Sequence, residues 1–240
     1  MTVTENATRV ADPGLGDPVL DNAPWTSLTG PHRRFAERRG GAVRYSPDVA
    51  PFVALADPGD PQSWTDVSQL LGPGVGFAVS GSDVHPPESW QTELVGVGVQ
   101  LVDVELVKQH DPEAVRLGPA DLPDILDLVE RTKPGPFRRR TIELGTYLGI
   151  RRGGALVAMA GERLHPPGWT EISAVCTDPA HRGQGLATRL VSAVAAGIAD
   201  RGDRVLLHAL ATNTPAIDLY FSRGFRLRRY TEFRSVTTPE

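Results

Sequence analysis

The stretch TDPAHRGQGLAT, residues 177–188, joins the end of a predicted strand to the start of a predicted helix through a glycine-rich loop. The first backbone N–H groups of a helix have no acceptor inside it, and the helix dipole adds partial positive charge there. Gly183 and Gly185 carry no Cβ, so a pyrophosphate can approach the backbone closely. Arg182 can add a charge-assisted hydrogen bond, and Thr188 can add a hydroxyl. The stretch therefore predicts a phosphate-binding turn.

Three other interpretations of these glycines are a plain turn, a dinucleotide-binding fingerprint and a Walker A loop. A plain turn before a helix stays open on the loop alone. A dinucleotide-binding fingerprint needs a third glycine and a loop that follows the strand directly. Here Thr188 stands where the third glycine would be, and residues 178–182 separate the strand from the glycines. No Gly-Lys-Ser/Thr follows, so a Walker A loop is absent.

The segments around the loop predict an α+β fold, an α/β mixed sheet with helices, over residues 113–240. Hydrophobic periodicity and turn signals define its elements. In chain order they are a helix over 121–129, strands at 146–150, 156–163 and 169–177, a helix from Leu186 with Leu190, Val194 and Ile198 on one face, a strand at 205–207, a short helix from Pro215 and an extended segment from Phe225. Short turns join the three strands before the loop, which predicts an antiparallel meander.

The N-terminal half predicts a smaller α/β domain over residues 21–112, preceded by a flexible tail over 1–20. The change of pattern near Pro112 places the domain boundary. Within this half the sequence predicts helices at 25–38 and 63–71 and strands at 42–45, 52–55, 75–79 and 95–107.

Composition narrows the class of protein. The 240-residue chain has a formal net charge of −4 and a pI of about 5.9, which argues against nucleic acid as the main partner. The single cysteine, Cys176, excludes an internal disulfide and a multi-cysteine metal site, and no metal is expected. No apolar run approaches the ~20 residues that span a membrane, and no signal-peptide pattern opens the chain. These features predict a cytoplasmic protein without a membrane partner.

Three motifs in order resemble the GNAT superfamily of N-acetyltransferases. Residues 182–187, RGQGLA, match its Arg/Gln-x-x-Gly-x-Gly/Ala acyl-CoA signature. Residues 171–177, EISAVCT, resemble the strand before that signature, and residues 213–220 with Gly224 and Phe225 resemble the motif after it. The C-terminal half is most similar to the glycine N-acyltransferase-like group. For the N-terminal half, a degenerate second copy of the fold is the open alternative.

The resemblance implies where acetyl-CoA, the acyl donor, would bind. The backbone of Val175 and Thr177 would hold the pantetheine arm between two parting strands. Asn213 and Tyr220 would lie near the thioester sulfur. The pyrophosphate would bind backbone N–H groups of Arg182, Gly183, Gln184, Gly185, Leu186, Ala187 and Thr188.

The implied reaction is direct attack of a primary amine on the thioester within a ternary complex. Tyr220 is the candidate acid, because a tyrosine pKa near 10 lies above that of a thiol, near 8.5. Glu171 is the candidate base at the cleft mouth. Strand alternation would place it on the cleft face with Ser173, Val175 and Thr177, and would place Cys176 on the opposite face with Ile172 and Ala174 as a buried small hydrophobe.

The acceptor is left open among a small-molecule amine, an amino acid and a peptide. Candidate acceptor-binding residues are Phe137, Arg140 and Glu143 in the loop after the first helix. His208 is interpreted first as a satisfied core histidine and second as an acceptor contact. The alternative function is a non-catalytic acyl-CoA sensor or partner-binding module, and the oligomeric state is open, with a homodimer among the alternatives.

Overall fold

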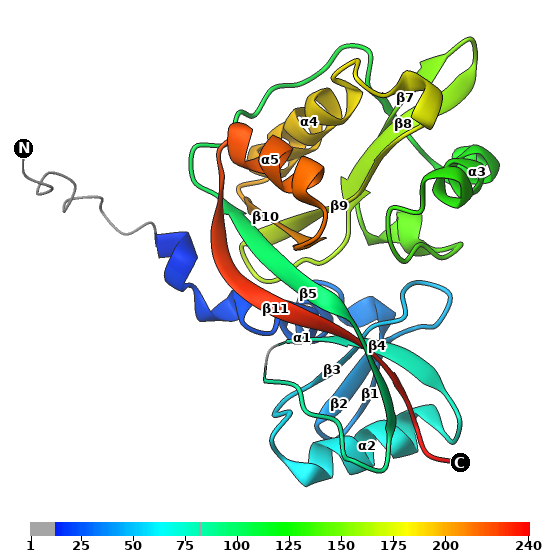
Figure 1. The fold of residues 1–240 in the computed structure, drawn as a ribbon, viewed down its shortest axis with the longest axis vertical. Helices are drawn as coiled ribbons and strands as arrows, with labels where there is room; N and C mark the ends of the chain where they lie inside the picture. The colour runs from blue at the N-terminus through cyan, green and yellow to red at the C-terminus, as the bar shows by residue number, and fades with distance from the viewer. Residues whose placement is uncertain (1–12, 82) are drawn as a thin grey trace, which may run out of the picture.

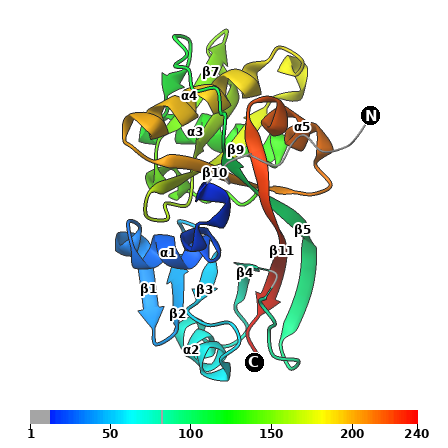
Figure 2. The same ribbon diagram turned by 90° about the vertical axis from the view of Figure 1, so that its left-hand side faces the viewer.

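The structure is a computed structural model of the chain, and it describes residues 13–81 and 83–240. It has one sheet of three strands, in the order β1-β2-β3, and one of eight, in the order β4-β11-β5-β10-β9-β8-β7-β6. Figure 1 shows two lobes joined by the long β5–β11 ribbon, and Figure 2 shows that ribbon running along one side of both lobes. Among the described residues, no helix is long and apolar enough to cross a membrane.

The elements have the following bounds. The helices are α1 (Ala23–Thr29), α2 (Pro61–Leu71), α3 (Leu122–Thr132), α4 (Leu186–Asp200) and α5 (Thr214–Ser222). The strands are β1 (Ala36–Arg39), β2 (Ala42–Tyr45), β3 (Val53–Leu55), β4 (Gly76–Ser80), β5 (Gln91–Asp103), β6 (Val115–Arg116), β7 (Tyr147–Arg152), β8 (Ala155–Glu162), β9 (Trp169–Thr177), β10 (Arg204–Leu210) and β11 (Phe225–Thr237).

The large sheet combines strands from both halves of the chain. Strands β7 to β9 form the predicted antiparallel meander, β6 adds an unpredicted strand at its edge, and β10 pairs parallel to β9. The next strand is β5, which pairs antiparallel with β11 from Gln91 to Asp103 and antiparallel with β10 from Gly98 to Val102. The predicted boundary at residue 112 therefore falls between strands of one sheet, and the segment 21–112 supplies two of its eight strands.

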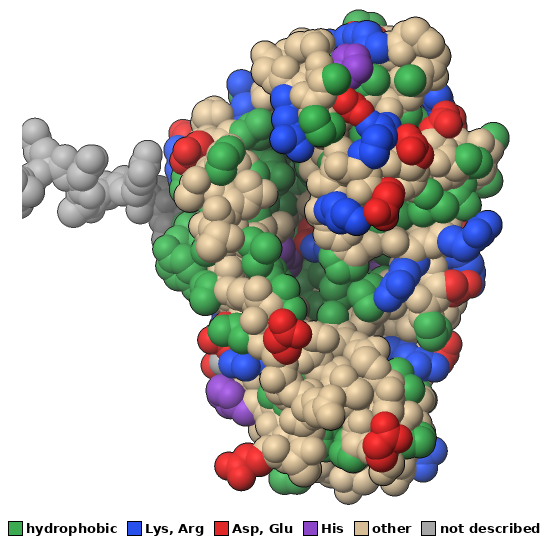
Figure 3. Space-filling model, turned by 45° about the vertical axis from the view of Figure 1, so that its right-hand side comes forward, with side chains coloured by type: hydrophobic (Ala, Val, Ile, Leu, Met, Phe, Trp, Pro, Cys, Tyr) green, Lys and Arg blue, Asp and Glu red, His purple; other side chains and the backbone are tan. Residues whose placement is uncertain are grey.

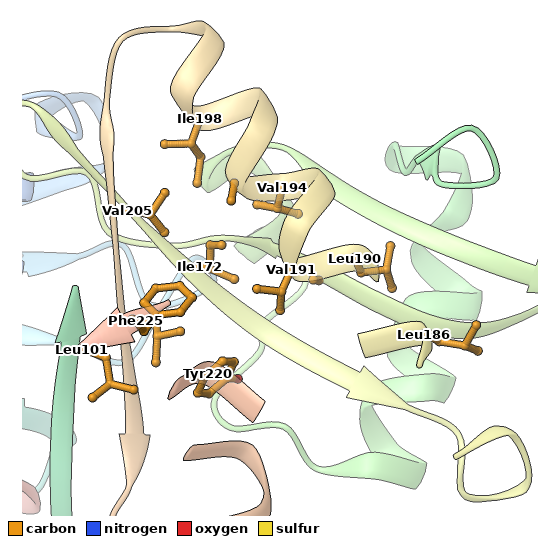
Figure 4. Close-up of a cluster of buried hydrophobic side chains, with 14 of the residues drawn as sticks. Leu101, Ile172, Leu186, Leu190, Val191, Val194, Ile198, Val205, Tyr220 and Phe225 are labelled. Carbon is orange, nitrogen blue, oxygen red and sulfur yellow. The ribbon is translucent and has the colours of Figure 1, made fainter. Parts of the chain in front are cut away.

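Helix α4 covers one face of this sheet. Its side chains at Leu186, Leu190, Val194 and Ile198 are buried, as the four-residue spacing predicts, and they pack with Val205 and Phe225 (Figure 4). The opposite face is covered by α3 and, farther along the strands, by the N-terminal elements. Successive residues of β10 show the two faces, because Val205 joins the α4 cluster while Leu206 joins the N-terminal cluster.

Two N-terminal predictions are wrong. The helix predicted over 25–38 ends at Thr29, because Gly30 and Pro31 follow and proline disfavours helix in the residue before it. Residues 36–39 are instead the strand β1. The tail predicted over 1–20 is anchored from residue 13 on. Leu20 is buried, and Asp17 accepts a hydrogen bond from the Trp169 indole N–H at 2.9 Å. Residues 1–12 lie outside the described part of the chain.

Candidate active site

The central feature is a parallel strand pair that parts. Strands β9 and β10 are paired only from Trp169 to Glu171 and from Arg204 to Leu206. Beyond those residues β9 keeps its pairing with β8, and β10 keeps its pairing with β5 as far as Leu210. Each strand is thus held on one side and leaves its facing backbone edge unpaired.

A β-bulge in β9 changes which side chains face which way. Ala174 has φ 53°, and two β9 residues, Ala174 and Val175, stand opposite the single β8 residue Ala160. As a result Val175 packs on the α4 side together with Ile172, whereas Ala174 and Cys176 join the cluster under α3. The predicted grouping of Ile172 with Ala174 and Cys176 is therefore wrong, because the alternation rule assumes a strand without a bulge.

The bulge leaves backbone groups of β9 facing the gap. The Asp178 N–H points to β8 and donates to the Val157 carbonyl at 2.8 Å. Since successive N–H groups alternate, those of Thr177 and Val175 point toward the unpaired edge. The buried Oγ1 of Thr177 has no hydrogen-bond partner among the described residues. The arrangement supports, without testing, the predicted pantetheine contacts at Val175 and Thr177.

The glycine loop forms a turn that presents free N–H groups. Gly183 and Gly185 have φ values of 76° and 71°, a conformation that favours glycine, and Gly185 is the N-cap of α4. The Arg189 N–H donates to the Gly185 carbonyl at 3.1 Å. The three preceding helical N–H groups, those of Leu186, Ala187 and Thr188, have no acceptor within the helix.

The surroundings of the turn are open on one side and anchored on the other. Arg182 and Gln184 are exposed, and a Cβ added to either glycine would meet nothing within 4 Å. Behind the turn, Asp178 accepts a hydrogen bond from the Ala180 N–H at 2.8 Å and forms an ion pair with Arg131 of α3. The turn can therefore hold an anion without rearranging its own supports.

Tyr220 reaches the α4 side of the sheet from α5. It is 8% exposed, and its ring centroid lies 5.7 Å from that of Phe225 (Figure 4). Its hydroxyl has no hydrogen-bond partner among the described residues. Burial raises the pKa of Tyr220 to about 12, so the phenol is protonated at neutral pH. Asn213 caps α5 by accepting a hydrogen bond from the Ala216 N–H at 3.4 Å.

Glu171 lies in a different place from the one predicted. Its side chain is fully buried, and Arg163 donates two hydrogen bonds to it at 2.8 and 2.7 Å. Burial raises the pKa of Glu171, but the charge and hydrogen bonds of Arg163, with the hydrogen bond from His208, hold it well below its usual range. A carboxylate with these donors is a weak proton acceptor, and the prediction of a base at the cleft mouth is wrong as to position.

The predicted acceptor-binding residues, Phe137, Arg140, Glu143 and His208, lie in three different environments. Phe137 packs edge-on against Tyr147, with ring centroids 5.7 Å apart. Arg140 pairs with Glu143 at 2.8 Å and with Asp48 at 3.1 Å, so its charge is neutralised locally.

His208 is part of the Glu171 group. Its Nδ1 lies 2.7 Å from a Glu171 carboxylate oxygen. Arg163, their partner, was not among the predicted site residues. The signal for it was the short turn between the predicted strands 156–163 and 169–177, which pairs Arg163 with Glu171 across the β8–β9 hairpin.

A separate cavity of about 420 Å³ lies at the N-terminal elements. It is bordered by α1, β3 and β4, and Asp21, Asp57, Asp83 and Arg229 are among its lining residues. None of the predicted site residues lines it.

The mixed sheet, its parting strand pair and the glycine turn before α4 together define the fold of an acyltransferase. A putative acetyltransferase of the GNAT family from Novosphingobium aromaticivorans is 36% identical to this chain. The match covers 93% of this chain and 100% of that one, with a TM-score of 0.83. The chain belongs to the GNAT family of acetyltransferases.

Other comparisons agree on the family and cover less. The family described as FR47-like protein matches residues 147–234. N-alpha-acetyltransferase RimI of Mycobacterium tuberculosis is 39% identical over 83 residues, which are 33% of this chain and 51% of RimI. The chain thus spans about half the length of that curated relative. A GCN5-related N-acetyltransferase from Kribbella flavida shares the fold, with 18% identity, a TM-score of 0.58, and 91% and 96% of the two chains covered.

Proposed function

We propose that this protein is an acetyl-CoA-dependent N-acetyltransferase that moves the acetyl group to a primary amine by direct attack in a ternary complex. The observation that carries the proposal is the gap between β9 and β10, which leads to the free N–H groups at the start of α4. In this proposal the pyrophosphate of acetyl-CoA binds at the turn over residues 182–188, and the pantetheine arm follows the β9 edge at Val175 and Thr177.

Direct transfer is favoured over a covalent acetyl-enzyme. Cys176 is the only cysteine, and it is buried in the apolar cluster under α3. Burial raises the pKa of the Cys176 thiol, which disfavours the reactive thiolate. Tyr220, protonated at neutral pH, is the proposed acid that protonates the departing CoA thiolate, and Asn213 fixes the start of its helix.

The acceptor class is proposed from the curated relative. RimI is named an N-alpha-acetyltransferase, so a peptide with a free α-amino group is the first acceptor to test. A small-molecule amine and an amino acid are the other candidates. Three predictions are independent of this mechanism: action in the cytoplasm, the absence of a nucleic-acid partner, and a homodimer as one alternative for the oligomeric state.

The test measures CoA thiol release from acetyl-CoA with spermidine, glycine and a hexapeptide with a free N-terminal alanine. We expect release with at least one of these amines and none in their absence. Calorimetry with CoA runs in parallel. Tight CoA binding with no release from any amine would instead support the alternative, a non-catalytic acyl-CoA sensor or partner-binding module.

A further inference from the structure

A row of hydrogen-bonded polar side chains crosses the sheet where β9 and β10 part. Arg228 Nη1 lies 2.8 Å from Gln100 Oε1, and Gln100 Nε2 lies 3.1 Å from His208 Nε2. His208 Nδ1 lies 2.7 Å from Glu171 Oε1, and Arg163 holds both oxygens of that carboxylate. The row joins β11, β5, β10 and β9 to the residue after β8.

The chemistry of the row sets the direction of every hydrogen bond. A guanidinium only donates, so the Gln100 atom that meets Arg228 is the carbonyl oxygen. The amide nitrogen then donates to the Leu20 carbonyl at 2.9 Å and to His208 Nε2. At its other nitrogen, His208 donates from Nδ1 to the ionised Glu171. These hydrogen bonds place the His208 proton on Nδ1 and the lone pair on Nε2.

His208 also stands at the mouth of the gap. It is two residues beyond Leu206, where pairing with β9 stops, and its side chain is 9% exposed, whereas that of Glu171 is 0% exposed. Figure 3 shows a hollow in the middle of one face of the molecule, with mainly hydrophobic side chains around it. A histidine here can meet a ligand that the buried carboxylate cannot.

Three strands, β9, β5 and β11, present side chains to His208. Strand β9 presents Glu171, with Arg163 behind it. Strand β5 presents the neutral Gln100, with Arg228 of β11 behind it. Strand β11 also presents Phe233, whose ring centroid lies 6.3 Å from that of the imidazole. The one charge in direct contact with His208 among the described residues is thus the Glu171 carboxylate.

We propose that His208 Nε2 takes the proton of the acceptor's ammonium group, and that Glu171, held by Arg163, is a positioning residue that keeps the lone pair on Nε2. This inference rests on the proposed function. An alkylammonium is a charge-assisted donor and displaces the weaker Gln100 amide N–H from Nε2.

The transfer then balances as follows. One ammonium N–H bond breaks and its proton moves to Nε2. The amine lone pair forms the C–N bond to the thioester carbon, and the C–S bond breaks as the thiolate takes a proton from Tyr220. The second proton, lost by the nitrogen as the amide forms, restores Tyr220 through solvent, and the imidazolium returns its proton to water.

The tautomer is tested without any acceptor, by ¹⁵N NMR of histidine-labelled protein at pH 7.5, with His208 assigned by its loss in His208→Gln. We expect the Nδ1–H tautomer. In Glu171→Gln, Arg163 keeps the amide oxygen and turns the amide NH₂ toward Nδ1, so the tautomer inverts to Nε2–H. An Nε2–H tautomer or an imidazolium in the unmodified protein overturns the proposal, even if Glu171→Gln fails to fold.

The kinetic test compares kcat/KM of His208→Gln with the unmodified protein between pH 6.5 and 10, using whichever amine of the panel is acetylated. We expect a loss of about 100-fold at pH 7, typical of removing a general base. The loss shrinks as pH rises and the amine becomes neutral by itself. His110→Gln, at a side chain 70% exposed, is the matched control and keeps full activity.

A loss that is the same at every pH overturns the base role and indicates a structural one. CoA affinity is measured on each variant, and an unchanged affinity assigns the kinetic loss to His208 rather than to donor binding. If no amine in the panel is acetylated, the proposed function fails. The tautomer measurement still decides whether Glu171, held by Arg163, keeps the His208 lone pair on Nε2.

Discussion

At the scale of single residues, Tyr220 and Glu171 are both buried but have opposite ionisation states. Tyr220 has no charged partner, so burial alone raises its pKa to about 12 and keeps its proton in place. Glu171 is buried more completely, but Arg163 and His208 supply hydrogen bonds that hold it ionised. What each group can do in catalysis follows from its partner.

Replacing Tyr220 by Phe removes only the hydroxyl. We expect kcat to fall by about 100-fold, because the thiolate then leaves without a proton donor, with CoA affinity unchanged. Steady-state kinetics and calorimetry measure the two. Because the pKa of Tyr220 is raised to about 12, the unmodified enzyme should show no loss of this acid up to pH 10. Tyr230→Phe, at a side chain 61% exposed, is the control, and full kcat in Tyr220→Phe contradicts the acid role.

Replacing Cys176 by Ala tests direct transfer. The side chain is buried under α3 and its thiol pKa is raised, so we expect kcat to change by less than about twofold. The loss of one buried sulfur should lower stability by roughly 1 kcal/mol. Mass spectrometry after mixing with acetyl-CoA should find no acetylated protein. An acetyl adduct that Cys176→Ala abolishes would indicate a covalent route.

At the scale of elements, the turn before α4 depends on Gly183 and Gly185, whose positive φ angles are unfavourable for other residues. Replacing Gly185 by Ala puts a Cβ at φ 71°, which costs roughly 1–2 kcal/mol. Either the turn unwinds or α4 begins later, and in both cases the N–H groups move. We expect CoA affinity to fall about 10-fold by calorimetry, with a lower melting temperature.

Gly197 supplies the matched control for that substitution. It lies inside α4, has no positive φ, and a Cβ there would meet nothing within 4 Å. Gly197→Ala should therefore raise stability by about 0.5–1 kcal/mol and leave CoA affinity unchanged. If Gly185→Ala binds CoA as well as Gly197→Ala does, the phosphate turn is not the donor site.

Helix and strand bounds were predictable where one local signal dominates. The four-residue spacing from Leu186 defined α4, and apolar residues between turns defined β9 over Trp169–Thr177. The bulge at Ala174 was not predictable, because alanine carries no sign of a positive φ that tertiary packing imposes. The end of α1 was missed although Pro31 signals it, since the prediction took Gly40 and Gly41 as the end of the helix.

Long-range pairing was beyond local reasoning altogether. No local sequence signal near Gln100 indicates that β5 lies between β10 and β11. The shared sheet and the row of side chains through His208 could therefore not be predicted. The phosphate turn was foreseeable because its groups are consecutive in the chain. The partners of Glu171 come from residues 163 and 208, and only the first of these lies within one hairpin of it.

At the scale of the whole molecule, the shared sheet predicts that residues 113–240 cannot stand alone. Without β5, strands β10 and β11 lose the partner between them. We expect a fragment of residues 113–240 to aggregate or to lack the cooperative unfolding transition and CoA affinity of residues 13–240, by circular dichroism and calorimetry. A soluble, cooperatively folded fragment that binds CoA would contradict this and restore the boundary at 112.

His32 makes the contact between the N-terminal elements and residue 144 sensitive to acid. It is 3% exposed, bonded to the Tyr45 hydroxyl and the Leu144 carbonyl, and its ring lies 4.5 Å from that of His165. Burial and then the His165 charge lower its pKa to about 3. The folded state therefore keeps His32 neutral. The stability that neutral His32 contributes to the fold is fully present above pH 6.5 and is lost as pH falls toward 3.

The expected slope is about 1.4 kcal/mol of unfolding free energy per pH unit below 6.5, because the unfolded chain binds one more proton there. Urea unfolding between pH 7 and 5 measures it, a window above the titration of most carboxylates. His32→Gln should flatten the slope over that window, at some cost in stability at pH 7. An unchanged slope in His32→Gln would assign the acid sensitivity to another group.

The place of β5 also has a consequence for how the chain is made. Strand β5 ends at Asp103, and its neighbour β11 begins only at Phe225. During synthesis from the N-terminus, β5 leaves the ribosome on the order of ten seconds before β11 exists. Through that interval the apolar side chains of Val99, Leu101 and Val102, which are buried in the finished fold, have no complete sheet to join. We therefore expect the nascent chain to bind a chaperone until β11 has been translated.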